Sequence, residues 1–384
     1  MTGRERDILG IIENNPFVSQ NEIAARLGLS RSAVSVYLNS MYKKGVIRGR
    51  GYIIREETYP LLIGPSHIDI RSICNPIPIN GVHTSINTRV IYGGPVKNTA
   101  EYLLGLGVFP RVIFAVASDS FGASFLASCR DAGIETEGSV IVRGSASPVY
   151  IETVDTRRRF ISASFTTSNL STHITAKHLD RQPKVLRNAS TIVVHDSLPI
   201  ESMEYLRRFK SKAKIILVSS EIQYTYALRE VLDIFDVITF SHSLAYKLVH
   251  GVDVEPSGTE PPDICCLAED LLGLGVSAFY LLLSATDFCY GADDRLVLHS
   301  SKSAVGPSEA LHRIYLDCRD LMSAMVAYGA ENCLEPGEIL NLMAAARNLR
   351  FDSDIGFAQR LSISQLQEEI KNLEEQTILY DLSQ

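Results

Sequence analysis

Asp317, Cys318, Arg319 and Asp320 form a charged stretch that directly follows three apolar residues at 314–316. This order predicts a short buried strand, a loop, and then a helix that begins near Asp320. A helix N-terminus presents unpaired backbone N–H groups and the positive end of the helix dipole, so it can bind an anion. An aspartate at that point serves more often as an N-cap than as a catalyst, so these residues alone leave both roles open.

Two further stretches have residue types suited to holding a small polar molecule. In Tyr92-Gly-Gly-Pro-Val-Lys-Asn-Thr-Ala100, the glycines precede a predicted helix and let the backbone approach a ligand closely. Asp69 follows the apolar segment 61–64, and a carboxylate can accept hydrogen bonds from two neighbouring hydroxyls of a sugar. On local grounds Asp69 is equally well explained as a residue that caps a turn.

Together these stretches resemble the PfkB (ribokinase-like) family of carbohydrate and nucleoside kinases, over about residues 60–375. The positions that match the family's Gly-x-x-x-x-Asp and Gly-Gly-x-x-x-Asn-x-Ala patterns are Gly64, Asp69, Gly93, Gly94, Asn98 and Ala100. The resemblance implies that Asp69, Gly93, Gly94 and Asn98 bind the substrate or an effector. It also implies that Asp320 would take the proton from a substrate hydroxyl, and that β-strands between 147 and 162 form a lid and a dimer contact.

The nucleotide half of the family pattern is altered. The altered positions are Ser241 and Leu244 for Asn-x-x-Glu, Ser284 and Asp287 for Gly-x-x-Gly, and Asp317, Cys318 and Arg319 for Gly-Ala-Gly. Leucine cannot hold a metal ion or its water. Asp317 would face a phosphate, and two like charges about 4 Å apart repel by about 4 kcal/mol at an effective dielectric constant of about 20. We therefore expect a pseudokinase with no metal ion and no cofactor.

The first 56 residues predict a separate winged helix-turn-helix domain. Helices are expected over 4–14, 21–27 and 31–44, followed by a hairpin over 46–55. This segment holds nine Lys/Arg and five Asp/Glu, a net charge of +4, so the remainder carries −11 of the total of −7. The residues expected to contact bases are Arg31, Ser32, Ser35 and Asn39, and those expected to contact phosphates are Lys43, Lys44, Arg48 and Arg50. DNA is favoured over a protein partner because the third helix and the hairpin lack acidic residues.

Between 61 and 375, apolar β-type segments alternate with helical ones, which favours a doubly wound α/β sheet covered on both faces, with the small β lid. The expected division is 1–56 for the DNA-binding domain, 57–60 for a linker, 61–375 for the ribokinase-like domain and 376–384 for a tail. Seven cysteines without framework spacing indicate free thiols in a cytoplasmic protein. No apolar run is long enough to cross a membrane.

These patterns predict a transcription regulator that binds double-stranded DNA as a homodimer and senses a sugar, a nucleoside or a phosphorylated derivative. The alternative is an active kinase that carries a DNA-binding appendage. In that case Asp320 would be the base, and magnesium and ATP would be required. A scaffold that uses the hairpin for protein contacts has no feature in its favour.

Overall fold

The computed structural model divides the chain into two compact units, Met1–Thr58 and Tyr59–Gln384. The structure describes residues 1–47, 58–74, 85–156, 160–166, 168–219, 225–251, 261–284, 287–301, 311–351, 361–373 and 375–382. Among these residues no helix has both the length and the apolar character needed to cross a membrane.

The first unit contains α1 (Gly3–Asn14), α2 (Gln20–Leu27) and α3 (Arg31–Lys43), as the sequence predicts. Side chains of Thr2, Ser19 and Ser30 cap the three helices and satisfy backbone N–H groups in each first turn. One apolar cluster, which includes Ile8, Ile23 and Val34, packs the helices together. The predicted hairpin lies outside the described residues from position 48 onward, so Arg48 and Arg50 do too.

A ten-stranded sheet forms the centre of the second unit, in the order β14-β13-β12-β11-β10-β9-β8-β1-β4-β5. The run from β5 to β11 is parallel, and β12, β13 and β14 are added antiparallel. Its strands are β1 (Tyr59–Pro65), β4 (Arg111–Ala117), β5 (Val140–Val142), β8 (Ala189–His195), β9 (Lys214–Val218), β10 (Val237–Ser241), β11 (Ala278–Leu282), β12 (Asp287–Ala292), β13 (Arg295–Ser301) and β14 (Glu375–Asp381).

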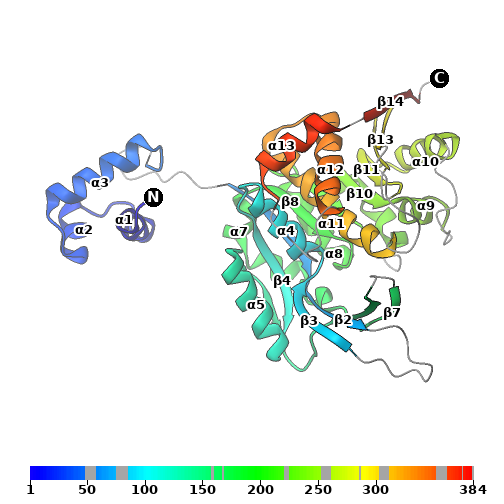
Figure 1. Cartoon of the computed structure of the whole chain (residues 1–384). Coiled ribbons are helices and arrows are strands. Elements are labelled where there is room, and N and C mark those ends of the chain that lie inside the picture. Colours follow the sequence, from blue (N-terminus) through cyan, green and yellow to red (C-terminus); the bar gives the residue numbers. More distant parts are fainter. Residues whose placement is uncertain are drawn as a thin grey trace. The chain divides into compact units, whose positions relative to one another are not determined.

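Helices cover both faces of this sheet because its strands are apolar on both sides. Leu61 and Ile63 of β1 join one core cluster and Leu62 joins the other, as the alternation of side chains along a strand requires. In Figure 1, α4, α11, α12 and α13 lie on one side of the strands. The helices are α4 (Pro95–Gly105), α5 (Ser120–Ala132), α6 (Ala176–Asp180), α7 (Pro183–Arg187), α8 (Ile200–Leu206), α9 (His242–His250), α10 (Pro261–Gly273), α11 (Leu311–Asn332), α12 (Pro336–Phe351) and α13 (Ile363–Asn372), with short 3-10 turns at Leu170–His173, Arg207–Phe209, Thr225–Glu230 and Leu232–Ile234.

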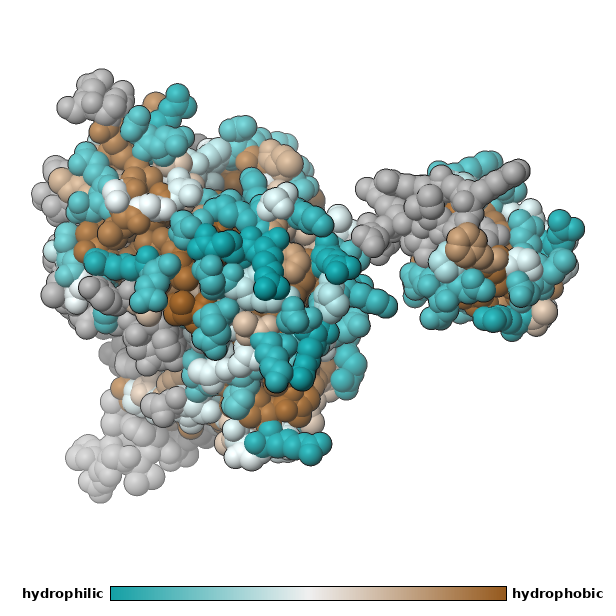
Figure 2. Space-filling view, turned by 180° about the vertical axis from the view of Figure 1, so that it is seen from behind, coloured by the Kyte–Doolittle hydropathy of each residue, from teal (hydrophilic) through white to brown (hydrophobic). Residues whose placement is uncertain are grey.

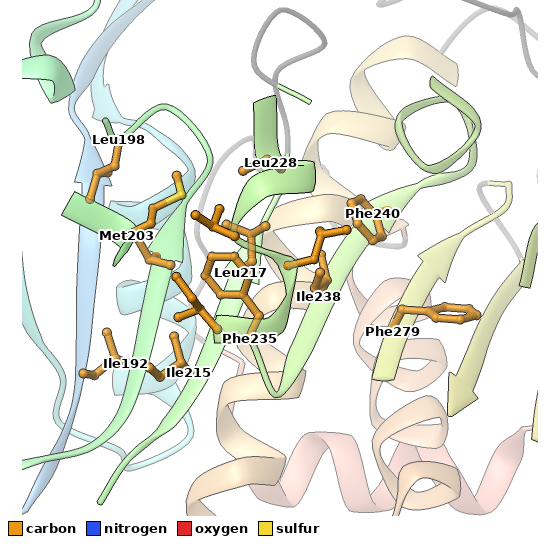
Figure 3. Packing of buried hydrophobic residues seen from close by; sticks show 14 of the residues in the cluster. Ile192, Leu198, Met203, Ile215, Leu217, Leu228, Phe235, Ile238, Phe240 and Phe279 are labelled. Carbon is orange, nitrogen blue, oxygen red and sulfur yellow. The ribbon is translucent and has the colours of Figure 1, made fainter. Parts of the chain in front are cut away.

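The larger core cluster lies between the sheet and helices α6 to α10. Figure 3 shows part of it, with Ile192, Ile215 and Ile238 contributed by three successive parallel strands. Burying each such side chain stabilises the fold by about 1.5–3 kcal/mol. On the outside, the face drawn in Figure 2 is mixed, with hydrophilic residues covering most of it and apolar patches of the larger unit between them.

A second, four-stranded sheet forms the lid, in the order β3-β2-β6-β7. Its strands are β2 (His67–Cys74), β3 (Ser85–Gly93), β6 (Val149–Asp155) and β7 (Phe160–Phe165). β2 follows β1 with only Ser66 between them, so the lid begins where the first strand of the large sheet ends. The predicted ribokinase-like fold class with a small β lid is confirmed.

Several predicted elements and boundaries differ from the structure. The strand expected at 314–316 and the helix start expected near Asp320 are both replaced by one continuous helix, α11, which begins at Leu311. No glycine or proline occurs from 311 to 320 to interrupt a helix. The expected tail from 376 instead forms most of β14, which pairs with β13, and the expected linker at 57–60 gives way to β1 at Tyr59.

Candidate functional site

The candidate ligand site lies at the carboxyl end of β1. The chain places β4 on one side of β1 and β8 on the other, and such a point in an open parallel sheet is where ligands bind. The residues that follow β1 enter the lid, so His67 and Asp69 lie only two and four residues after the last residue of β1. The predicted site residue Asp69 is therefore positioned by the junction between the large sheet and the lid.

Asp69 is buried, with 5% of its surface exposed. Its Oδ1 lies 3.1 Å from Nε2 of His67. Its Oδ2 is buried and has no hydrogen-bond partner in the part of the chain that the structure describes. Leaving a buried acceptor unsatisfied is destabilising, which makes this oxygen a candidate acceptor for a hydrogen bond from a bound molecule.

Gly93 lies directly against Asp69, and Gly94 lies against His67, which leaves little room for a side chain at either position. A Cβ atom at position 93 would overlap Oδ2 of Asp69. Gly94 has a φ of +111°, and a Cβ there would lie 3.3 Å from Nδ1 of His67. Close approach therefore requires glycine at position 93, and the backbone conformation favours it at position 94, next to the predicted ligand residue Asp69.

Asn98 links this site to Asp320. Its Nδ2 donates a hydrogen bond of 2.7 Å to Oδ2 of Asp320, and Thr99 Oγ1 lies 3.4 Å from the Asp320 carbonyl oxygen. Asn98 lies in the first turn of α4 and Asp320 lies inside α11, and these two helices belong to the same core cluster. The structure therefore brings the two predicted stretches together, although Asp320 does not cap a helix as the sequence suggested.

His195 and Asp196 form a buried polar pair that the sequence analysis missed. Nδ1 of His195 lies 3.2 Å from Oδ1 of Asp196 and 2.9 Å from Oγ of Ser197, and Ser219 Oγ donates to Asp196 Oδ2 at 2.9 Å. Burial, followed by the positive charges of Arg319 and His67, lowers the pKa of His195 to about 3. The signal was available, because His-Asp-Ser directly follows the apolar strand at 191–194.

In the first unit, α3 presents a polar face opposite its buried residues Val34, Leu38 and Met41. Of the predicted contact residues in α3 and just after it, Arg31, Ser32, Asn39, Lys43 and Lys44 are exposed and Ser35 is half-buried. The sequence analysis missed Val36, which is 67% exposed on the same helix. An exposed valine has no role in the core, and an apolar side chain on such a helix can contact a thymine methyl group.

Lys44 has a structural partner that was not predicted. Its Nζ donates to both carboxylate oxygens of Glu5 at 2.7 and 2.9 Å, and Ser40 Oγ donates to Oε1 at 2.8 Å. The hydrogen bond from Lys44, followed by that from the Thr2 backbone N–H, lowers the pKa of Glu5 to about 2. The charge of Lys44 is thus partly neutralised inside the domain, whereas the structure gives exposed Lys43 no such bond among the described residues.

Comparison with known proteins decides the family. Residues 63–255 match the model of the pfkB family of carbohydrate kinases, and residues 1–48 match a winged helix-turn-helix DNA-binding model. The chain belongs to the pfkB family. Its second unit is called the PfkB domain below.

Curated relatives of this chain include two proteins of Escherichia coli. An uncharacterized sugar kinase, YeiI, is 29% identical over 207 residues, which cover 54% of this chain and 57% of YeiI. A pseudouridine kinase is 26% identical over 161 residues, which cover 40% of this chain and 49% of that protein. The chain therefore spans only about half the length of the curated relatives that it matches.

Solved structures agree on the fold. A carbohydrate kinase from Agrobacterium tumefaciens has a TM-score of 0.68 at 16% identity. The match covers 84% of this chain and 100% of the kinase chain. A ribokinase from Arabidopsis thaliana, in complex with ribose and ATP, has a TM-score of 0.66 at 15% identity. The match covers 82% of this chain and 99% of the ribokinase chain.

The residues at the altered positions of the PfkB domain cap helices, pack in the core or bond to other residues of the protein. Ser241 caps α9, and Leu244 is buried in the core. Ser284 Oγ donates to Asp287 Oδ2 at 2.5 Å, and Ser300 Oγ donates to Asp287 Oδ1 at 2.7 Å, so both carboxylate oxygens of Asp287 accept bonds from serines of the protein itself. Asp317, Cys318 and Arg319 all lie within α11, and Cys318 is buried.

Proposed function

We propose that this protein is a transcription regulator whose PfkB domain binds a sugar, a nucleoside or a phosphorylated derivative without phosphorylating it. The observation that carries the proposal is the continuity of α11. In a helix that begins at Leu311, the amide N–H groups of residues 317–320 bond to carbonyl oxygens one turn earlier. They are then not free to hold a transferring phosphate, which is the role of the Gly-Ala-Gly segment in the resembling kinases.

The contrast between the two halves of the site supports the same proposal. The half around Asp69 retains an acceptor for a ligand, because a buried carboxylate oxygen has no partner there among the described residues. In the other half, Leu244 lies in the core and Asp287 is satisfied by Ser284 and Ser300. These residues do not fit a magnesium ion or a nucleotide phosphate, since leucine offers no oxygen ligand and both carboxylate oxygens of Asp287 already accept hydrogen bonds.

Regulation would couple ligand binding by the PfkB domain to DNA binding by the first unit, within a cytoplasmic homodimer. One winged helix reads a short half-site, so two are needed for a longer operator. A ligand can shift DNA affinity only if it binds the DNA-competent and incompetent arrangements of the dimer with different affinities. Closure of the lid over Asp69 is the proposed source of that difference, because the lid strands carry Asp69 itself.

The first test is calorimetry of the full chain with magnesium and ATP, and with a panel of pentoses and nucleosides. We expect heat from one sugar or nucleoside and none from ATP. Binding of ATP at micromolar concentration would contradict the proposal that the PfkB domain has lost phosphoryl transfer. The ligand found is then added to a DNA-binding assay with genomic fragments, where it should change the affinity.

DNA binding is tested separately with Arg31→Ala, because Arg31 is exposed at the start of α3. We expect a loss of affinity of about tenfold, the effect of one good contact to a base. Arg143→Ala is the matched control, since Arg143 is an exposed arginine of the PfkB domain. Absence of DNA binding at about 50 mM salt, where phosphate contacts are strongest, would end the regulator proposal.

One observation favours the alternative, an active sugar or nucleoside kinase. Asn98 holds the carboxylate of Asp320 beside the ligand half of the site, where a base that takes a proton from a hydroxyl would be needed. ATP turnover in the wild-type protein that disappears in Asp320→Asn would establish this alternative. Turnover that persists in Asp320→Asn would come from another enzyme in the preparation.

A further inference from the structure

Three side chains form a row across the lid sheet. Asp69 on β2 pairs with Tyr150 on β6, and Tyr150 pairs with Phe165 on β7. Residues that pair directly on neighbouring strands point to the same face of the sheet. Asp69, Tyr150 and Phe165 therefore share one face, and His67, two residues before Asp69, shares it as well.

Ring contacts join the members of this row. The rings of Tyr150 and Phe165 are 6.4 Å apart between centroids. The rings of His67 and Phe165 are 6.0 Å apart and nearly perpendicular, at 83°. Phe165 nevertheless remains 52% exposed, so its aromatic ring can contact a bound molecule.

Two polar atoms in the row are buried and have no hydrogen-bond partner within the described residues, Oδ2 of Asp69 and the hydroxyl of Tyr150. Burial, followed by the negative charges of Glu152 and Asp69, raises the pKa of Tyr150 to about 12. The phenol therefore keeps its proton at neutral pH and can donate it in a hydrogen bond. A fitting ligand has hydroxyl donors for Asp69 and an acceptor for Tyr150.

We propose that the ligand of this site is a nucleoside rather than a free sugar, with the ribose hydroxyls on Asp69 and the base against Phe165 and Tyr150. A base supplies both missing features, a flat π face for the exposed phenylalanine and a carbonyl oxygen or ring nitrogen that accepts from the tyrosine hydroxyl. A free pentose supplies hydroxyls for Asp69 but no aromatic face. This inference rests on the proposed function, because it names the class of effector that the PfkB domain senses.

The test is calorimetry of the full chain with ribose, uridine, cytidine, adenosine and guanosine. We expect at least one nucleoside to bind about tenfold or more tightly than ribose, as expected for stacking of one base on an aromatic ring. Phe165→Leu should weaken that nucleoside and leave ribose unchanged. Tyr150→Phe keeps the ring and removes only the hydroxyl, so it should weaken the nucleoside by about tenfold and leave ribose unchanged.

Tyr205→Phe is the matched control, because the hydroxyl of Tyr205 bonds to Asp180 on an exposed surface elsewhere in the domain. It should bind every probe as the wild type does. Ribose binding as tightly as all four nucleosides, or Tyr150→Phe weakening ribose and nucleoside equally, would overturn the nucleoside inference and leave the sensor proposal standing. If the wild-type protein binds DNA but none of the five probes, the nucleoside inference fails and so does sensing of a pentose or nucleoside.

Discussion

Asn98 and Asp320 are separated by 222 positions in the chain, yet the Nδ2 of the first donates a 2.7 Å hydrogen bond to Oδ2 of the second. This bond ties the first turn of α4 to the middle of α11 at the edge of the ligand site. The carboxylate of Asp320 is therefore held by the side chain of Asn98 and not by backbone N–H groups at a helix N-terminus. The arrangement keeps an aspartate in place even though the segment before it is helical.

We expect Asn98→Ala to lower the free energy of unfolding by about 1–2 kcal/mol, because the variant removes a partner of a charged acceptor. Asn98→Asp should lower it further, because two carboxylates at hydrogen-bond distance repel each other. Urea denaturation of the full chain near neutral pH measures both. Equal stability of the two variants would show that the Asp320 carboxylate is not where the structure places it.

Replacing Asp317, Cys318 and Arg319 by Gly, Ala and Gly should shorten α11 at its N-terminal end. Each glycine is less favourable than alanine in a helix by about 1 kcal/mol. Hydrogen exchange over 311–320 should speed up, and ATP binding should become measurable as amide groups are released. The control replaces the same three residues by alanine, which removes the side chains and keeps a helix former. ATP binding by the alanine variant would assign the effect to side chains instead.

The pKa of Glu5 predicts how the DNA-binding unit responds to acid. Because the folded state lowers this pKa from 4.5 to about 2, its stabilising contribution is present above pH 4.5 and is lost as the pH falls toward 2. Glu5→Gln should therefore speed amide exchange in α1 and α3 at neutral pH, with a smaller difference from wild type near pH 3. Glu13→Gln, on the exposed side of the same helix, should exchange as the wild type does at both pH values.

Lys43 and Lys44 are adjacent and exposed but should contribute differently to DNA binding. Lys43→Ala should remove about one phosphate contact. The slope of the logarithm of the binding constant against the logarithm of the salt concentration should then become less steep by about 0.9. Lys44→Ala should change the slope less, since its ammonium group already bonds to both oxygens of Glu5. Fluorescence anisotropy with a labelled duplex of mixed sequence between about 50 and 200 mM salt measures both slopes. A larger slope change for Lys44→Ala would contradict this account.

Local patterns were sufficient where local forces decide the structure. The helices of the first unit follow from capping residues and apolar spacing, and Ser19 with Glu22 forms a capping box at the start of α2. The parallel strands follow from short β-branched runs such as that at 191–194. The positions that match the family motif come together in the structure, since Gly93 lies against both Asp69 and Asn98, and their binding of a ligand stays a prediction.

The errors occurred where a motif was transferred without its glycines. The expected loop before Asp320 depended on Gly-Ala-Gly, and Asp-Cys-Arg contains no residue that interrupts a helix. Likewise, the polar and apolar residues of 376–381 have no clear period by themselves. They become β14 because the edge of β13 offers them hydrogen-bond partners.

The sequence by itself determined two domains, their classes and the residues around Asp69, because capping, hydrophobic period and a family motif are all local in the chain. Only the tertiary structure decided that Asn98 meets Asp320, that Glu5 partly neutralises Lys44, and that Tyr150 and Phe165 stand in one row with Asp69. Each of these pairs depends on strand register or helix packing between distant segments. Such contacts are set by the burial of apolar surface over the whole domain and leave no pattern between neighbouring residues.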